Sequence, residues 1–225
     1  MDQAHLIWNS LLHENVSANG FVDYAGFKMA GKELDRYLEF LSSHPPRLTD
    51  ELHEQIAYWI NAYNAFTIKL IISNYGVTSI KDIVQDEHTS PWKIPFFRIG
   101  NEIFSLDRIE HEILRKRFSE PRIHFVLVCA SYSCPRLRNE AYTAAQLEKQ
   151  LEDQTSDFIN DSSKNALHCE PVGVSSIFKW YAEDFKPLFA DNRSMLQWMN
   201  KYANHQVNEN ASIEYLPYNC QLNGK

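Results

Sequence analysis

The spacing of hydrophobic residues near the start of the chain predicts amphipathic helices. HLIWNSLLHENV, residues 5–16, and KELDRYLEFLSS, residues 32–43, each repeat apolar positions every three or four residues, which is the period of a helix with one buried face. An Asn-Gly turn follows the first stretch. Pro45 and Pro46 stop the second, because proline lacks the amide that a helix interior needs. Two N-terminal helices are therefore expected.

The longest predicted helix covers residues 50–74. Thr49 is its expected N-cap, two acidic residues follow in the first turn, and Gly76 lies just beyond its end. One face is an apolar stripe, and the opposite face holds alanines, isoleucines, Asn61 and Asn64 in place of charged residues. A helix that is apolar on two sides is expected at the centre of the protein.

Asn61 and Asn64 need hydrogen-bond partners in such a helix, because an unpaired buried amide costs roughly 1–3 kcal/mol. Two interpretations are open. The asparagines hold the backbone of a neighbouring loop, or one of them orients a catalytic base or donates to a reacting oxygen.

Downstream, short β-prone runs alternate with short helices. IPFFRI and EIFS flank a Gly-Asn turn, which predicts a hairpin over 94–105, and Ser105 is the expected cap of a helix that runs to about Phe118. The apolar, β-branched run RIHFVLVCA predicts a buried strand over 123–129. Thr143 is the expected start of another helix, AAQLEKQLEDQTSDFI.

The C-terminal third completes the prediction of an α+β fold. It contains a possible strand around NALHCEPV, the aromatic block SIFKWYAEDF, a helix in NRSMLQWMNKYA and an extended piece, ASIEYLPY. The chain is expected to form a single domain over residues 1–225, rich in helices, with a long central buried helix and a small mixed or antiparallel sheet.

Composition and charge exclude several classes of protein. A net charge of −7 opposes binding to nucleic acid, which depends on clustered Lys and Arg. No stretch reaches the ~18 apolar residues of a membrane span, and the N-terminus lacks a basic start followed by an apolar run, so a soluble cytoplasmic protein is expected. An exported protein whose signal peptide had been removed would give the same sequence. Four cysteines are too few for a disulfide scaffold and are expected as reduced thiols.

Two residues of the helix after Ser105 depart from an amphipathic pattern. At 100° per residue, Glu110 falls in the middle of the buried arc and His111 lies at its rim. A carboxylate that points into a core must be paired, neutralised or functional. The structural interpretation is an ion pair of Glu110 with Arg122 or Arg138. The functional one makes Glu110 and His111 part of a site.

The stretch RIHFVLVCASYSCPRLR contains the most reactive residue types. In a strand, His124 and Cys129 would point to opposite faces, and Cys129 would be a small hydrophobe in the core. Cys134 lies beyond the strand end, where Pro135 can begin a short helix or turn, a place that favours a reactive thiolate. The spacing of His124, Cys129 and Cys134 does not match a structural zinc site, so neither a metal nor a cofactor is expected.

Several blocks together resemble a known family. YWINAYNAFTI, SLDRIEHEILR, RIHFVLVCASYSCP and SSIFKWYAEDF, with NGFVDYAGF near the start, are similar to the successive blocks of the domain of unknown function 547 family, over about residues 5–222. Members occur as stand-alone bacterial proteins, many of them exported, and in eukaryotes beside coiled-coil, DEP or glutaredoxin modules. The resemblance implies no established activity.

The family pattern has matching residues at Asn61, Asn64, Glu110, His111, His124, Cys129 and Cys134. The chain departs from the pattern at two places. Ala130 stands where a glycine-like residue is usual, and Tyr218-Asn219-Cys220 stands where Tyr-Asp-Trp is usual. The second change removes a carboxylate, so no catalytic role is expected at that position.

Three functions remain open. In a thiol-dependent hydrolase or acyl transferase acting on a small molecule or peptide, Cys134 attacks a carbonyl, His111 or His124 is the base, and Glu110 or an asparagine orients the histidine. In a non-catalytic interaction module, the aromatic residues of 178–181 bind a peptide or partner protein. In a thiol redox protein, Cys129 and Cys134 form a reversible disulfide.

Overall fold

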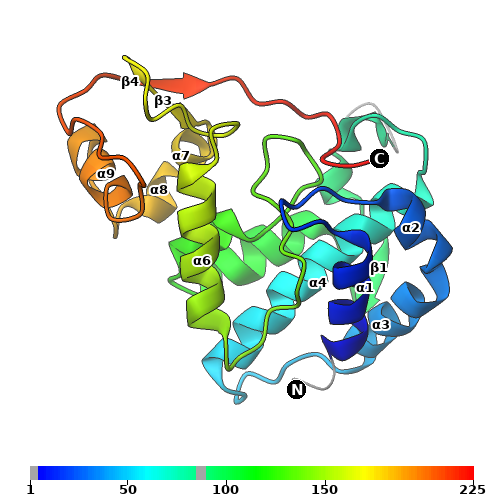
Figure 1. The fold of residues 1–225 in the computed structure, drawn as a ribbon. Helices are drawn as coiled ribbons and strands as arrows, with labels where there is room; N and C mark the ends of the chain where they lie inside the picture. The colour runs from blue at the N-terminus through cyan, green and yellow to red at the C-terminus, as the bar shows by residue number, and fades with distance from the viewer. Residues whose placement is uncertain (1–4, 85–89) are drawn as a thin grey trace.

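The computed structural model describes residues 5–84 and 90–225, and its N-terminal half is a set of helices around one central helix. Helices α1 (Leu6–Asn15), α2 (Tyr24–Met29) and α3 (Gly31–Ser43) pack together and against α4 (Leu52–Ser73). Figure 1 shows α4 crossing the middle of the molecule with these three helices on one side. Two helices were predicted here, and both are confirmed; α2 is an additional one.

Helix α4 is central, as its two apolar faces predict. Every residue from Gln55 to Ile68 is buried. The predicted cap at Thr49 is wrong, because the Glu51 carboxylate accepts the Glu54 N–H at 3.1 Å and the helix begins at Leu52.

Two small sheets of two strands each take the place of the single sheet expected. The predicted hairpin is confirmed: β1 (Phe97–Ile99) and β2 (Glu102–Phe104) are antiparallel and turn at Gly100, whose φ of +60° suits glycine. The second sheet pairs β3 (Val172–Ser175) with β4 (Ile213–Leu216) in parallel. With 49% of the described residues helical and 10% in strands, the helix-rich α+β class is confirmed.

The C-terminal half builds a second apolar core. Helices α6 (Leu147–Asn160), α7 (Ile177–Trp180), α8 (Ala182–Phe185) and α9 (Asn192–Met199) surround a cluster of aromatic rings in contact, which includes Phe125, Phe178 and Trp198. Thr143 does not open a helix, because its N–H bonds to the Gln150 side chain and residues 144–146 form a turn before α6 begins at Leu147.

The predicted strand over 123–129 is wrong. Residues Pro121–Phe125 form a 3₁₀ turn, and the chain then runs through the core without regular structure. The Asn64 amide donates to the Val126 carbonyl at 3.0 Å, and its oxygen accepts the Val128 N–H at 2.9 Å. A side chain of α4 therefore satisfies the backbone groups that a neighbouring strand would otherwise pair.

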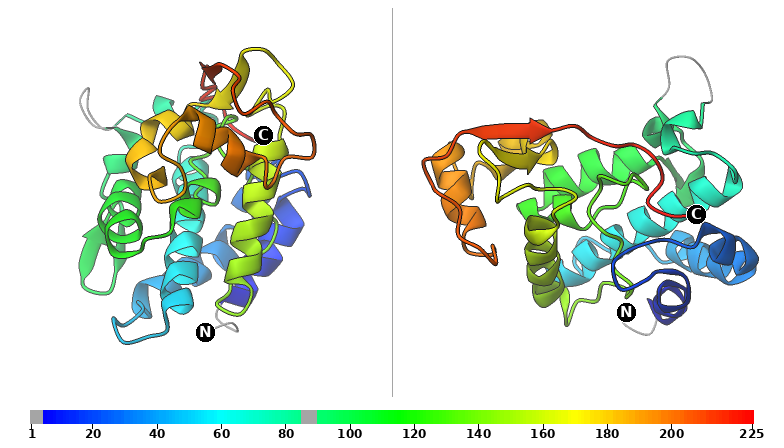
Figure 2. Two further views of the ribbon diagram at one scale, coloured as in Figure 1. Left: turned by 90° about the vertical axis from the view of Figure 1, so that its left-hand side faces the viewer. Right: turned by 45° about the horizontal axis from the view of Figure 1, so that its top comes forward.

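Residues 217–225 form a strap, which we define as the segment that follows β4. Figures 1 and 2 show it running from β4, beside the C-terminal helices, back to the N-terminal half. Its end is held there by backbone hydrogen bonds of Asn223 and Lys225 with Val22 and Tyr24. The strap also pairs with residues 131–133, so it crosses the segment that contains Cys134.

Within the described residues, 3₁₀ turns at Ile80–Asp82, Pro91–Lys93 and Pro121–Phe125 join these elements. Among the described residues, no helix is both long and apolar enough to cross a membrane. Residues 1–4, which begin the stretch considered for a signal peptide, lie outside the described residues.

Candidate functional site

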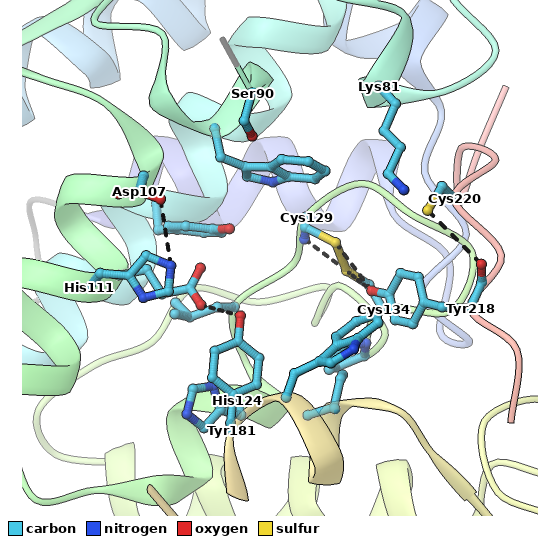
Figure 3. A pocket seen from close by; sticks show the side chains of 17 residues that line it. Lys81, Ser90, Asp107, His111, His124, Cys129, Cys134, Tyr181, Tyr218 and Cys220 are labelled. Atoms are coloured by element: carbon cyan, nitrogen blue, oxygen red, sulfur yellow. Dashed lines mark hydrogen bonds and ion pairs between the residues drawn. A yellow bond between two sulfur atoms is a disulfide. The ribbon is translucent and has the colours of Figure 1, made fainter. Parts of the chain in front are cut away.

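A pocket of about 350 Å³ opens between the two halves of the chain. Glu110, His111, His124, Cys129 and Cys134 all line it, although they come from different elements (Figure 3). Most of the residues predicted from the sequence as site candidates are therefore gathered in one cavity. The size lies at the lower end of the roughly 300–1,000 Å³ of small-molecule sites.

Cys129 and Cys134 are joined in a disulfide on the pocket wall (Figure 3). This corrects the expectation that all the cysteines are reduced; Cys169 and Cys220 are free. The loop between the two cysteines folds back on itself and places their Cα atoms 6.2 Å apart, within the usual span of a disulfide. Cys129 is partly exposed rather than a core hydrophobe, and Cys134 is 4% exposed.

Two hydrogen-bond donors contact the sulfur of Cys134. The Cys129 N–H lies 3.0 Å from it, and the Tyr218 hydroxyl, on the strap, lies 3.1 Å from it and 3.3 Å from the Cys129 sulfur. No helix follows Pro135, so a helix N-terminus does not act on this thiol. Burial raises the pKa of Tyr218 above the ordinary value, which keeps the phenol a donor.

Glu110 is buried beside two phenols. The Tyr181 hydroxyl donates to its carboxylate at 2.6 Å, and the Tyr63 side chain interacts with the same carboxylate electrostatically. Burial raises the pKa of each tyrosine, and the nearby Glu110 carboxylate raises it further. The predicted ion pair is wrong: Arg122 pairs with Glu120, Glu148 and Glu152, and Arg138 with Glu140 and Asp153.

The helix that carries Glu110 is wider than an α-helix. Residues Arg108–Leu114 form a π-type segment, continued by α5 (Arg115–Arg117), and the Arg115 N–H bonds to the Glu110 carbonyl five residues back. The Ser105 hydroxyl accepts the Arg108 N–H and caps the start, as predicted. The wider turn was not anticipated, but the 100° projection still holds for both residues: Glu110 is buried, and His111, at the rim, is partly exposed.

The two histidines belong to one charged network. His124 Nε2 lies 2.8 Å from the Asp184 carboxylate, which also forms an ion pair of 2.5 Å with Arg115. Arg115 lies 2.7 Å from His111 Nδ1, and His111 Nε2 lies 3.6 Å from Asp107. Burial opposes the charge on Asp184, but hydrogen bonds from His124 and Arg115 outweigh it and lower the pKa of this carboxyl well below its usual range.

The two asparagines of α4 hold backbone and do not line the pocket. Asn61 donates to the Tyr142 carbonyl at 2.8 Å and accepts the Tyr142 N–H at 3.0 Å, and Asn64 bridges Val126 and Val128 as described above. Both amides are therefore used to fix segments of the core. Asn64 holds the residues three positions and one position before Cys129, and so positions one end of the disulfide.

Comparison with known proteins places the matched segment over the centre of this site. The family model described as "Protein of unknown function, DUF547" matches residues 48–159, about half of the chain. The chain belongs to the DUF547 family. No curated protein and no solved structure matches it.

The DUF547 match covers Glu110, His111, His124 and both bonded cysteines, whereas other pocket residues lie beyond it. Tyr181 and Tyr218, which line the pocket, and Asp184, which bonds to His124 behind it, follow the matched segment, and sequence reasoning assigned them no role in catalysis. The aromatic block contained Tyr181 and Asp184, but nothing in its pattern indicated their partners.

The backbone conformation of Ala130 explains why a glycine-like residue is usual at this position in the DUF547 family pattern. Its φ is +63°, a left-handed conformation that is strained for residues with a side chain. A glycine-like residue is usual at this position in the resemblance, and alanine is the smallest alternative. Asn219 stands where the family pattern has an aspartate. Its backbone carbonyl accepts the Ser133 N–H and its backbone N–H donates to the Ser133 hydroxyl, so it supports the loop between the two bonded cysteines.

Proposed function

We propose that the protein carries out thiol–disulfide exchange, with Cys129 and Cys134 as its redox pair and the pocket as its substrate site. The observation that carries this proposal is the disulfide on the wall of a pocket of small-molecule size. A disulfide with a purely structural role would need no access from a cavity.

The contacts of the disulfide support a direction of attack. The partly exposed Cys129 sulfur is the reachable electrophile, and the buried Cys134 sulfur is the leaving group. An incoming thiolate forms a bond to the Cys129 sulfur, the Cys129–Cys134 bond breaks, and its electron pair leaves on Cys134. The Cys129 N–H and the Tyr218 hydroxyl would stabilise that thiolate.

The exchange is completed by a second thiol. Attack of this thiol on the substrate sulfur of the mixed disulfide releases the Cys129 thiolate and oxidises two substrate thiols to a disulfide. The cysteine pair gains the two electrons, and the substrate thiols lose their two protons. The reverse sequence reduces a substrate disulfide.

A hydrolase or acyl transferase that uses Cys134 is the second candidate, because the pocket also contains His111, His124 and Glu110. It requires a base within about 2.6–3.2 Å of the nucleophile. In the described structure, the polar contacts of the Cys134 sulfur are donors, and both histidines bond to the network around Asp184 and Arg115. Exchange is therefore the better-supported proposal.

The test is multiple-turnover oxidation of dithiothreitol by a small disulfide such as hydroxyethyl disulfide. The rate should rise in proportion to protein concentration and fall to background in C129S and in C134S. C169S is the matched control, since Cys169 is exposed and lies outside the pocket, and it should keep the wild-type rate.

Two outcomes would oppose the proposal. If the disulfide resists dithiothreitol until the protein unfolds, the pair has a structural role. If the reduced protein instead releases a burst of nitrophenol from an activated ester, and the burst is lost in C134S but kept in C129S, the second candidate is favoured.

A further inference from the structure

Opposite charges lie on the two sides of the disulfide. Figure 3 shows the Lys81 ammonium group on one side of the Cys129–Cys134 pair and Asp107 on the opposite side, and all four residues line the pocket. The exchange chemistry uses neither charge. An arrangement of this kind points to the ligand rather than to the reaction.

Lys81 is available to an anion. Its side chain is exposed, and no carboxylate among residues 5–84 and 90–225 forms an ion pair with it. It lies in the short 3₁₀ turn Ile80–Asp82, which is fixed by hydrogen bonds from Thr78 and Ser79 to the Asp82 carboxylate. The position of the backbone under Lys81 is therefore set before any ligand binds.

The opposite side of the pocket suits a cation. The Asp107 carboxylate is partly exposed, with its histidine partner 3.6 Å away, so it retains acceptor capacity. Glu110 adds a second carboxylate at the same wall. The rings of Trp92 and Trp180 also line the cavity, and aromatic faces attract ammonium groups.

We propose that the exchanging substrate is a short zwitterionic thiol, or its disulfide, in which the thiol lies between an ammonium group and a carboxylate, as in a tripeptide with a central cysteine. Its thiol reaches Cys129, its carboxylate faces Lys81, and its ammonium group faces Asp107 and Glu110. The inference rests on the proposed exchange function. A pocket of about 350 Å³ admits such a molecule and excludes a folded domain.

The test uses four forms of one peptide, Gly-Cys-Gly, as reductants of the oxidised protein: with free ends, N-acetylated, C-amidated, and blocked at both ends. Each rate is divided by the thiolate fraction of that peptide, measured separately. The free peptide should react fastest. Each blocked end should cost about two- to fivefold, the range of a partly solvated charge contact, and 0.5 M salt should reduce the difference.

Two variants assign the charges. K81M should remove the advantage of a free carboxylate and keep that of a free amine, and D107N should do the reverse. K116M is the matched control, because Lys116 is an exposed lysine outside the pocket, and it should keep both preferences.

The outcomes separate the inference from the proposed function. If all four peptides reduce the folded protein at the same rate, the exchange function stands and the zwitterionic substrate is overturned. The same holds if K81M changes all four rates equally. If dithiothreitol reduces the folded protein and no peptide does, the zwitterionic substrate is again overturned; if neither reduces it, the exchange function itself fails.

Discussion

Replacing Asn64 with leucine tests whether one side chain holds the segment that leads to the disulfide. Asn64 is 2% exposed, and its amide joins the Val126 carbonyl to the Val128 N–H, just before Cys129. Leucine has a similar size and the same branching, so N64L removes both hydrogen bonds without opening a large cavity.

The expected cost follows from the two backbone groups left without partners. Each buried, unsatisfied group costs roughly 1–3 kcal/mol, so N64L should lower the free energy of unfolding by about 2–6 kcal/mol. Total stabilities of proteins are about 5–15 kcal/mol, which makes this a large loss. Where the variant still folds, the loosened segment should also make the disulfide easier to reduce with dithiothreitol.

Asn160 provides a matched control for the urea-unfolding measurement. Its amide also bridges backbone groups, donating to the carbonyls of Ser156 and Tyr202 and accepting the Asn204 N–H, but at a partly exposed position. Water can replace those bonds, so N160L should cost less than about 1 kcal/mol. Equal losses for N64L and N160L would refute the reasoning, because burial would then not decide the cost.

Two further predictions concern the charged network and the strap. The pKa of the Asp184 carboxyl is lowered in the folded protein, so its charge stabilises the fold fully above the usual carboxyl pKa of 3.8, and this contribution is lost as the pH falls toward the folded value. D184N should therefore lower the free energy of unfolding in urea by about 1–2 kcal/mol at pH 7 and by less at pH 3. An equal cost at both pH values would contradict this reasoning. In G224A the added Cβ would lie 1.9 Å from the Val22 oxygen, so the strap end should detach, with a loss of about 1–3 kcal/mol. Reduction of the disulfide should then be slower, because the Tyr218 hydroxyl on the strap no longer stabilises the departing Cys134 thiolate. G31A, with no atom within 4 Å of the added Cβ, should leave the reduction rate unchanged.

The long helix α4 was predictable from the sequence, whereas the path of the segment after Pro121 was not, and the length of each apolar run explains the difference. Both are largely apolar and mostly buried, without a polar face. Over 22 residues such a pattern has room only for a helix, but over seven it fits any buried path. The segment is not a strand because Asn64 supplies the pairing that a second strand would give, and a side chain that mimics a strand neighbour leaves no periodic signal in the sequence.

The sequence predicted which residues belong to the candidate site better than it predicted their contacts. Glu110 and His111 were found because they break an amphipathic pattern. Their partners were not, since Tyr181 and Asp184 come from a segment about 70 residues further along the chain. The disulfide depends on a left-handed residue at Ala130, which lets the loop fold back, and spacing between cysteines does not contain that information.

The residues that line the pocket come partly from the matched segment and partly from the rest of the chain. Residues 48–159 contribute the disulfide, Glu110 and the two histidines, which line the pocket together. The strap then brings Tyr218 to both sulfurs, and α8 brings Asp184 to His124. The disulfide therefore belongs to the family segment, while the hydroxyl that we propose stabilises the Cys134 thiolate comes from the strap. Detaching the strap should thus change the rate of the proposed exchange without removing the cysteine pair, which is why G224A and C134S probe different parts of the same proposed reaction.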